Sequence, residues 1–258
     1  MINNLKTAII TGGLGGIGIG IVKFFYNRNY NVIIIDNKNK IFFSKINFKK
    51  KKNFIKYYKI DLSKPQSIKL KFSFIKKEFK VIDVLVNCAG IQYVQNIESF
   101  PNYKWEQIIN TNLSSSFYTS KYVLPLMKKN NWGRIINIAS VHGQVASLNK
   151  SAYVASKHGM IGLTKTLALE TAKIPITCNA ICPGWVNTPL VSKQIKINAK
   201  KNKTNKVLET KILLNEKHPN LKFISTEAIA SMAYYLCSDE AAEITGSSIN
   251  IDGGWTSQ

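Results

Sequence analysis

Short apolar runs alternate with longer segments of helical pattern along the whole chain. The runs that predict β-strands cover residues 6–11, 31–36, 54–60, 82–86, 134–139, 176–181 and 247–251. Most of them contain consecutive apolar residues, which is typical of strands buried on both faces of a parallel sheet. Helices are predicted over residues 21–28, 65–79, 105–128, 152–171 and 226–237. This order predicts a single α/β domain over residues 1–258, a doubly wound parallel sheet without an internal repeat.

The segment between the strand at 176–181 and the helix at 226–237 is longer than an ordinary loop. Pro183 and Gly184 end the strand, and residues 187–223 consist mostly of helix-forming types. Long insertions of this kind commonly cover a binding site. We therefore expect a helical lid over about residues 190–223.

A glycine-rich turn follows the first strand directly. Residues 12–20 read GGLGGIGIG, a helix follows, and the second strand, NVIIID, ends at Asp36. Glycines let backbone N–H groups approach a pyrophosphate at a helix N-terminus, and an acid after the second strand binds ribose hydroxyls. This order predicts a Rossmann-type dinucleotide site, in a register that is ambiguous because the spacing G-x-G-x-x-G also fits from Gly13. Asp36 would repel a 2′-phosphate and favours NAD over NADP, although Lys38 lies close by.

Three polar side chains stand where one small carbonyl group could reach all of them. Ser140 follows the apolar run at 134–139, so it lies at the C-terminal edge of the sheet, where open parallel sheets bind ligands. Tyr153 and Lys157 are four residues apart in a predicted helix and share one face. A free tyrosine titrates near pH ~10, and a nearby ammonium or a cationic nicotinamide ring lowers its pKa toward neutrality. We expect Ser140 to hold a substrate oxygen while Tyr153 transfers its proton.

Length and composition limit the class of protein. The chain has 258 residues, 45% of them hydrophobic, which is enough for a substantial core. No apolar run reaches the roughly 18 residues of a membrane span, and the first strand begins too early for a signal or transit peptide. We therefore expect a cytoplasmic protein without a membrane association.

The net charge of +22 is the unusual feature of the composition. Such an excess would suit nucleic acid, an anionic surface or an acidic substrate. The lysines are spread over predicted loops and helix faces, however, and asparagine and isoleucine, which share AT-rich codons with lysine, are abundant as well. Biased coding is the favoured explanation, and no nucleic-acid partner is expected. The lysine run at 49–52 is interpreted as a solvated loop.

The four cysteines form no C-x-x-C pair. Cys178 and Cys182 are expected to flank the strand at 176–181, while Cys88 and Cys237 lie in apolar segments. Four buried, reduced thiols are therefore expected rather than a disulfide or a metal site.

Several motifs, in order and correctly spaced, make the chain similar to the short-chain dehydrogenase/reductase family over essentially its whole length. The segment from Thr11 to Gly18 resembles the family's cofactor turn, residues 87–90 resemble its Asn-Asn-Ala-Gly element with a cysteine in second place, and Pro183-Gly184 resembles its nicotinamide loop. The resemblance implies a catalytic tetrad of Asn112, Ser140, Tyr153 and Lys157. It also implies that NAD is bound by Thr11, Gly12, Leu14, Gly16, Ile17, Gly18, Asp36, Asp61, Leu62, Asn87, Ala89, Gly90, Tyr153, Lys157, Pro183, Gly184 and Val186.

Within this family, the residues around the predicted site resemble those of members that act on (R)-3-hydroxybutyrate. The likeness is weaker before about residue 81. It implies a substrate site made of Gln92, Ser140, His142, Lys150, Tyr153, Trp185, Gln194 and Trp255. Of these, the glutamines, His142 and Lys150 would bind the carboxylate, since they offer amide donors and a cation, and the tryptophans would wall the small pocket. Each residue alone has an ordinary explanation as surface, loop or packing.

The resemblance implies NAD-dependent, reversible oxidation of (R)-3-hydroxybutyrate to acetoacetate with Tyr153 as general base and no metal. Lys157 would lower the pKa of the tyrosine and bind the nicotinamide ribose, and Asn112 would anchor a water that relays protons. A homotetramer formed through the helices at 105–128 and 152–171 is implied as well. Three alternatives remain. The first, a 3-oxoacyl thioester reductase of the same family, is disfavoured by Asp36 and Lys150. The others are a sugar or polyol dehydrogenase and, more remotely, a basic nucleic-acid-binding protein on this fold.

Overall fold

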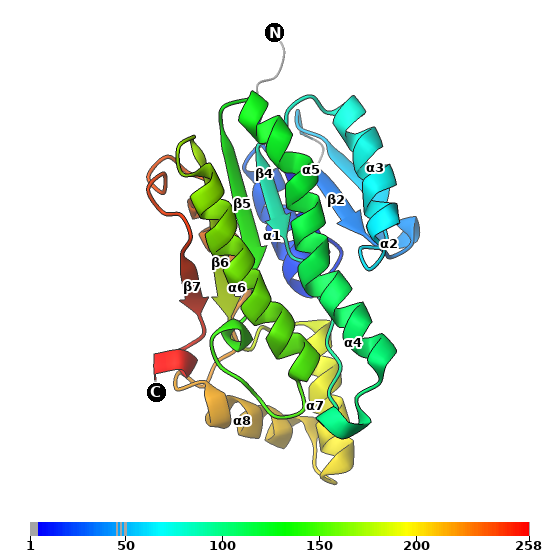
Figure 1. Cartoon of the computed structure of the whole chain (residues 1–258). Helices are drawn as coiled ribbons and strands as arrows, with labels where there is room; N and C mark the ends of the chain where they lie inside the picture. Colours follow the sequence, from blue (N-terminus) through cyan, green and yellow to red (C-terminus); the bar gives the residue numbers. More distant parts are fainter. Residues whose placement is uncertain (1–4, 45, 47, 49–50, 258) are drawn as a thin grey trace.

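Seven parallel strands form one sheet in the part of the chain that the structure describes, residues 5–44, 46, 48 and 51–257 (Figure 1). In this computed structural model the strand order is β3-β2-β1-β4-β5-β6-β7. The strands are β1 Thr7–Thr11, β2 Asn31–Asp36, β3 Ile55–Lys59, β4 Val84–Asn87, β5 Gly133–Ile138, β6 Ile176–Pro183 and β7 Ser248–Ile251. Each lies within two residues of its predicted bounds, and the predicted doubly wound sheet is confirmed.

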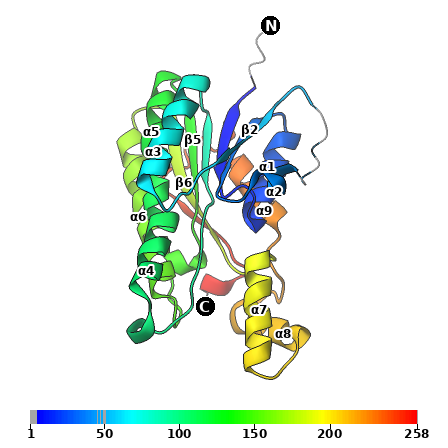
Figure 2. The same cartoon turned by 90° about the vertical axis from the view of Figure 1, so that its right-hand side faces the viewer.

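Helices cover both faces of the sheet and give the molecule three layers (Figure 2). One outer layer contains α1 and α9, and the other contains α3, α5 and α6. The α-helices are α1 Gly16–Asn27, α2 Lys40–Ser44, α3 Pro65–Glu78, α4 Asn102–Ile109, α5 Ser115–Lys129, α6 Ser151–Thr171, α7 Pro189–Lys201, α8 Lys206–Lys217 and α9 Thr226–Tyr235. The short helical turns are η1 Ile97–Ser99, η2 Asn110–Ser114, η3 Val141–Gly143 and η4 Trp255–Ser257.

The central strands are buried over their whole length because helices cover both faces. Every residue of β1, β4, β5 and β6 is buried. Ile10 and Ile34 belong to the core on the α1 and α9 side, whereas Ile9 and Ile33 belong to the core on the opposite side. Neighbours in sequence thus point into opposite layers, as the two-residue period of a strand requires. This is why the segments are continuous apolar runs.

The strand order reverses between β1 and β4. From β1, the strands β2 and β3 extend to one side, and β4 to β7 extend to the other. Because every pairing is parallel, the C-terminal ends of the strands meet at one edge, and α7 and α8 lie beyond it (Figures 1 and 2). Open sheets bind ligands where the strand order reverses. Gly12, Asp36, Asn87 and Ser140 all stand at this edge.

Helix α1 begins at Gly16, five positions before the predicted start. The glycines of its first turns lower its intrinsic helix propensity, so the pattern alone favours a later start. They also allow close packing: a β-carbon on Gly20 would come within 2.8 Å of Thr226 Cβ in α9. Burial of Ile21, Val22 and Phe25 stabilises the helix by tertiary contact.

The predicted helical stretch over residues 105–128 is present, because α4, η2 and α5 follow one another without a break. The π-helical form of its middle part, η2, was not predicted. A π-turn widens the helix locally by one residue and often marks a functional position. Asn112 lies within this turn, and its hydrogen bonds, described below, give the physical reason for the π-helical form.

Helices α7 and α8 form the predicted lid. Thr188 and Asn205 cap their N-termini through side-chain oxygens. At the base of the lid, Val186 and Ile224 form a β-bridge, and the Ile224 N–H donates to the Trp185 carbonyl at 2.9 Å. The two ends of the lid therefore lie next to each other, joined by main-chain hydrogen bonds.

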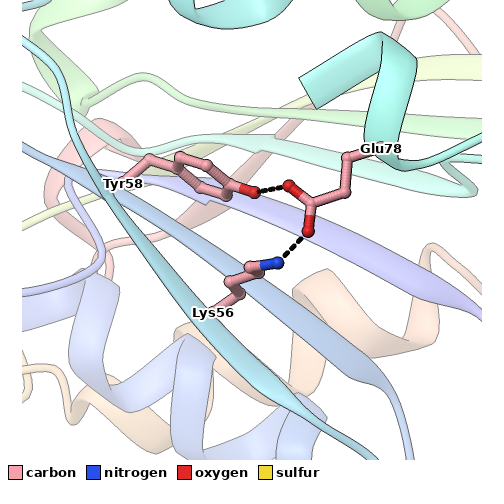
Figure 3. Close-up of polar contacts among 3 residues, drawn as sticks. All are labelled: Lys56, Tyr58 and Glu78. Atoms are coloured by element: carbon pink, nitrogen blue, oxygen red, sulfur yellow. Dashed lines mark hydrogen bonds and ion pairs between the residues drawn. The ribbon is translucent and has the colours of Figure 1, made fainter. Parts of the chain in front are cut away.

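Glu78, the last residue of α3, connects that helix to the edge strand β3 through hydrogen bonds (Figure 3). Its carboxylate accepts hydrogen bonds from Lys56 Nζ and from the Tyr58 hydroxyl. Lys56 and Glu78 are exposed, so this ion pair contributes about 0–1 kcal/mol to stability.

The cysteines are free thiols, and two details of the prediction are wrong. Cys88 is partly exposed, because it follows β4 at the open edge of the sheet, whereas Cys178, Cys182 and Cys237 are buried. Cys178 and Cys182 lie inside β6 and do not flank it, since the strand continues to its last residue, Pro183.

Three further observations concern membrane spans, metal ligands and the lysine run. No helix in the described ranges is long and apolar enough to cross a membrane. Within those ranges, no cluster of three His, Cys, Asp or Glu side chains is placed to hold a metal ion. Lys51 and Lys52 are exposed, while Lys49 and Lys50 of the same run lie outside the described residues.

Candidate active site

A pocket of about 90 Å³ lies at the C-terminal edge of the sheet, under the start of the lid. It is lined by Ile17, Gln92, Ala139, Ser140, Val141, His142, Tyr153, Pro183, Gly184, Trp185, Val186, Thr188, Leu190, Val191 and Trp255. The lining includes residues of the predicted cofactor site and of the predicted substrate site. The fold therefore brings the two predicted sites together in one place.

Ser140, Tyr153 and Lys157 meet beside this pocket. Ser140 follows β5, and its Oγ accepts the His142 N–H at 3.2 Å. Tyr153 and Lys157 share one face of α6, with Lys157 Nζ 5.7 Å from the centroid of the tyrosine ring. Lys157 is buried, and its Nζ donates to the Ile138 carbonyl at 2.7 Å. The lysine is therefore held at the end of β5, next to the serine.

The protein's own groups favour neutral Tyr153. Burial raises the pKa of Tyr153, and the Ser140 hydroxyl opposes this rise to a smaller extent. Burial also lowers the pKa of Lys157 to about 8. A net lowering of the Tyr153 pKa is therefore absent in the protein alone, because loss of hydration is the largest influence on this hydroxyl. A cationic nicotinamide ring would act in the direction that a base requires.

Asn112 links the loop after β4 to α6 through hydrogen bonds. It is fully buried, its Oδ1 accepts the Ile91 N–H at 2.9 Å, and its Nδ2 donates to the Ile91 carbonyl at 3.0 Å. The same Nδ2 donates to Ser156 Oγ of α6 at 3.1 Å. A β-carbon on Gly90 would lie 3.7 Å from Asn112 Oδ1 and 3.8 Å from Lys157 Nζ, so these groups surround one point. The water-anchoring role of Asn112 stays a prediction.

The turn between β1 and α1 has the shape that a dinucleotide phosphate needs. Gly12 has a φ of +63°, and a β-carbon there would lie 2.7 Å from Ala89 Cα. On Gly18, a β-carbon would lie 2.1 Å from the Gly12 carbonyl oxygen. No described side chain caps α1 at its N-cap residue, Gly15. The N–H groups of the first turn are therefore available to an anion, and the residues present fit such a cofactor.

The loop after β4 is held from beneath by buried polar groups. The Thr11 hydroxyl accepts the N–H groups of Cys88 and Ala89 at 3.0 and 3.2 Å. Asn87 Nδ2 donates to Asn137 Oδ1 at 2.9 Å inside the core. The hydroxyl of Thr11 thus holds the start of the loop through its main chain, and Asn87 anchors the preceding strand end in the core.

Asp36 is buried at the end of β2 with its carboxylate facing the glycine turn. Its Oδ2 accepts the Leu14 N–H at 3.0 Å, and its Oδ1 accepts the Lys38 N–H at 3.1 Å. A carboxylate offers about four acceptor positions, so two remain for ribose hydroxyls. The Lys38 ammonium donates to the Leu14 carbonyl at 2.6 Å, which directs this cation to the main chain rather than to the acid.

The other predicted cofactor residues lie along the same edge. Asp61 follows β3, and its Oδ1 accepts the Ser63 N–H and hydroxyl at 3.0 and 2.6 Å, while Leu62 is buried. Gly16 opens α1 against the lid, because a β-carbon there would lie 2.7 Å from the Thr188 side chain. Each of these contacts to a cofactor stays a prediction.

Lys150 stands buried behind the pocket wall. It is 6% exposed, and its Nζ lies 4.7 Å from the centroid of the Trp185 ring. Burial lowers its pKa to about 8. Lys150 forms no ion pair with any described residue. A buried ammonium is costly unless an anion compensates it, so this lysine is suited to a substrate carboxylate.

His142 and the two tryptophans form the aromatic side of the pocket. The ring of Trp255 lies 5.3 Å from His142 and 5.6 Å from Trp185, centroid to centroid. Burial lowers the pKa of His142 to about 3, and the positive charge of Lys150 acts in the same direction. The imidazole is therefore neutral, with Nε2 2.8 Å from Ser147 Oγ and Nδ1 3.4 Å from Ser140 Oγ. Its contact with a substrate stays a prediction.

Gln92 and Gln194 come together from opposite sides of the pocket. Gln92 follows β4, Gln194 lies on α7, and Gln92 Nε2 donates to Gln194 Oε1 at 3.2 Å. Both amides are partly buried, and the bond holds Gln194 beside Gln92, which lines the pocket. The inward movement of Gln194 on closure of the lid stays a prediction.

Several residues of the site were not predicted from the sequence. Thr188, Leu190 and Val191 line the pocket from the lid. Thr188 followed by Pro189 is a recognisable helix start, which could have extended the predicted lid to this wall. His218 is fully buried behind Trp185, and its position before Pro219 gave only the signal of a helix end.

Known proteins resemble this chain in sequence and in fold. Residues 6–199 match the family model described as short chain dehydrogenase. The chain is 44% identical to the D-beta-hydroxybutyrate dehydrogenase of Rhizobium meliloti, over 98% of this chain and 99% of that protein. It is 43% identical to the D-beta-hydroxybutyrate dehydrogenase of Cupriavidus necator, over 99% of both chains. The ligand-free aldohexose dehydrogenase of Thermoplasma acidophilum has a similar structure, with a TM-score of 0.87, 34% identity and coverage of 98% of this chain and 95% of that chain.

Proposed function

Because this chain belongs to the short-chain dehydrogenase family, we propose that it catalyses the reversible, NAD-dependent oxidation of (R)-3-hydroxybutyrate to acetoacetate. The observation that carries the substrate assignment is the buried, unpaired Lys150 ammonium beside Trp185. The small pocket is lined by Tyr153 and by Trp185, whose ring contacts that cation, and its size suits a short chain with a carboxylate at one end. The names of the two 3-hydroxybutyrate dehydrogenases that the chain resembles support the same assignment.

The chain's own residues would carry out the proton transfer and the orientation of the substrate. Ser140 holds the reacting oxygen, and Tyr153 accepts its proton during oxidation and returns it during reduction. Lys157 favours the phenolate of Tyr153 and binds the nicotinamide ribose. Lys150 and the two glutamines hold the carboxylate, so that the alcohol carbon lies at the tyrosine. A bound NAD supplies the hydride acceptor.

The choice of NAD over NADP rests on Asp36. Its buried carboxylate would accept bonds from the ribose hydroxyls and repel the 2′-phosphate of NADP. Lys38 is a nearby cation that could offset this repulsion, but its ammonium bonds the Leu14 carbonyl. The balance of these groups favours NAD.

The test is NADH formation from NAD and each enantiomer of 3-hydroxybutyrate, with NADP as the second cofactor. We expect rapid reduction of NAD by the (R)-enantiomer and little by the (S)-enantiomer or with NADP. Tyr153→Phe should lower kcat at least about 100-fold, since positioned proton transfer contributes about 10²–10⁴ in rate. Tyr103→Phe, an exposed tyrosine on α4, is the matched control.

Inactivity with both enantiomers would contradict the proposal. Reduction of acetoacetyl-CoA by NADPH in the same preparation would then support a 3-oxoacyl thioester reductase. A homotetramer built through α4, α5 and α6 stays part of the proposal, and light scattering would test it.

A further inference from the structure

We infer that His218 is a positioning residue for the substrate pocket. It fixes the position of Trp185, which forms one wall of the pocket, relative to the end of α8 in the lid. The role as a substrate wall rests on the function proposed above. The hydrogen bonds and packing do not depend on it.

His218 links two segments through both nitrogens of its ring. Its side chain is fully buried. Nε2 lies 2.8 Å from the main-chain nitrogen of Trp185 and accepts its N–H, and Nδ1 lies 2.7 Å from the Lys222 carbonyl. The first contact needs an unprotonated Nε2, and the second needs a hydrogen on Nδ1. Both are satisfied together only by the neutral Nδ1–H tautomer.

The imidazole also supports the pocket wall by packing. Its ring lies 5.9 Å from the Trp255 ring, and Trp255 in turn lies 5.6 Å from Trp185. A β-carbon on Gly184 would come within 2.5 Å of His218 Nε2. The strand end and the imidazole therefore fit only because residue 184 is a glycine.

The same residue ends the last helix of the lid. The His218 N–H donates to the Leu214 carbonyl of α8 at 2.7 Å, and its carbonyl accepts the Leu221 N–H at 2.8 Å. A shift of α8 would therefore move the ring that fixes the Trp185 main chain. His218 thus couples the position of the lid to the shape of the substrate pocket.

Two substitutions separate this role from a general contribution to packing. His218→Leu keeps an apolar side chain at the site but leaves the Trp185 N–H without its acceptor. His218→Gln keeps one acceptor and one donor on a side chain of similar reach. His158→Leu is the control, because His158 is exposed on α6 and outside the pocket.

We expect the leucine variant to raise KM for (R)-3-hydroxybutyrate about tenfold while KM for NAD changes less than twofold. An unpaired buried donor costs about 1–3 kcal/mol, which converts to factors of this size. The glutamine variant should restore most of the affinity. Hydrogen exchange should show faster exchange at the Trp185 amide in the leucine variant only. An unchanged substrate KM with a protected Trp185 amide would overturn the inference, as would a glutamine variant no better than leucine.

The tautomer can be measured without any variant. In protein labelled with nitrogen-15 at histidine, we expect the His218 signals of a neutral ring with its hydrogen on Nδ1. A hydrogen on Nε2, or a charged ring at neutral pH, would overturn the inference even if the variants failed to fold. If the wild-type protein did not oxidise 3-hydroxybutyrate, the proposed function would fail, while the exchange and tautomer measurements would still decide the link to Trp185.

Discussion

Gln92 and Gln194 are 102 positions apart in the chain, yet their side-chain amides bond to each other at 3.2 Å. One follows β4, on the fixed part of the fold, and the other lies on α7 of the lid. The bond therefore joins the lid to the sheet edge across the pocket.

The first prediction concerns this pair. Gln194→Ala should raise KM for 3-hydroxybutyrate about fivefold, because a neutral hydrogen bond is worth about 1 kcal/mol. Gln194→Glu keeps an acceptor for Gln92 but places a negative charge beside the substrate carboxylate, so its KM should rise further. Steady-state kinetics of both variants measure this. If the glutamate variant bound substrate like wild type, Gln194 would serve the lid contact alone.

The second prediction is a pH dependence set by Lys150. Because burial lowers its pKa to about 8, the ammonium is present below that pH and is lost as the pH rises through it. The inhibition constant of acetate, a carboxylate that does not react, should therefore increase above about pH 8. In Lys150→Gln the inhibition constant should be larger throughout and should change less with pH, the remaining change being that of Lys157, whose pKa is also about 8. An equally pH-dependent constant in the glutamine variant would assign the effect to another group.

The third prediction concerns the choice of cofactor. Asp36→Asn keeps the size of the side chain and an acceptor for the main chain but removes the charge that opposes a 2′-phosphate. The ratio of kcat/KM with NAD to that with NADP should fall at least about tenfold, since juxtaposed like charges cost several kcal/mol. Asp61→Asn, whose carboxylate bonds its own turn, is the control and should change the ratio less. An unchanged ratio in Asp36→Asn would remove Asp36 from cofactor selection.

The fourth prediction concerns stability. Asn137 is fully buried, accepts from Asn87 Nδ2 at 2.9 Å and donates to Thr164 Oγ1 at 2.8 Å. Asn137→Ala removes both of these buried hydrogen bonds and leaves a small void, and it should lower the free energy of unfolding by about 3 kcal/mol. Glu78→Gln at the exposed edge should cost less than about 1 kcal/mol. Urea denaturation measures both, and equal losses would contradict the importance of the buried network.

The layout of the fold could be predicted because the sheet is parallel and covered on both sides. Strands buried on two faces are mostly apolar along their length, so most of them leave an apolar run in the sequence. The meeting of Ser140, Tyr153 and Lys157 was predictable for a related reason. A strand end and the four-residue spacing of a helix place them at one edge before any tertiary contact is known.

The features that were not predicted depend on tertiary contacts, and such contacts leave no periodic pattern in the sequence. The π-turn η2 exists where Asn112 bonds the main chain of Ile91, a partner 21 positions away. His218 acquires its role only when α8 ends beside Trp185. The sign of the Tyr153 pKa shift follows from how much water the folded pocket excludes, and spacing carries no information on that quantity.

The bridge between Val186 and Ile224 has a consequence for how this protein can diversify. Since the lid leaves and rejoins the fold at adjacent main-chain positions, its internal length is not constrained by the sheet. Lengthening such a loop costs little entropy, about 0.6 kcal/mol for each doubling. The segment between these two residues is therefore a replaceable module. Exchanging it would alter which molecules enter the pocket while the proton-transfer chemistry beneath it is inherited unchanged.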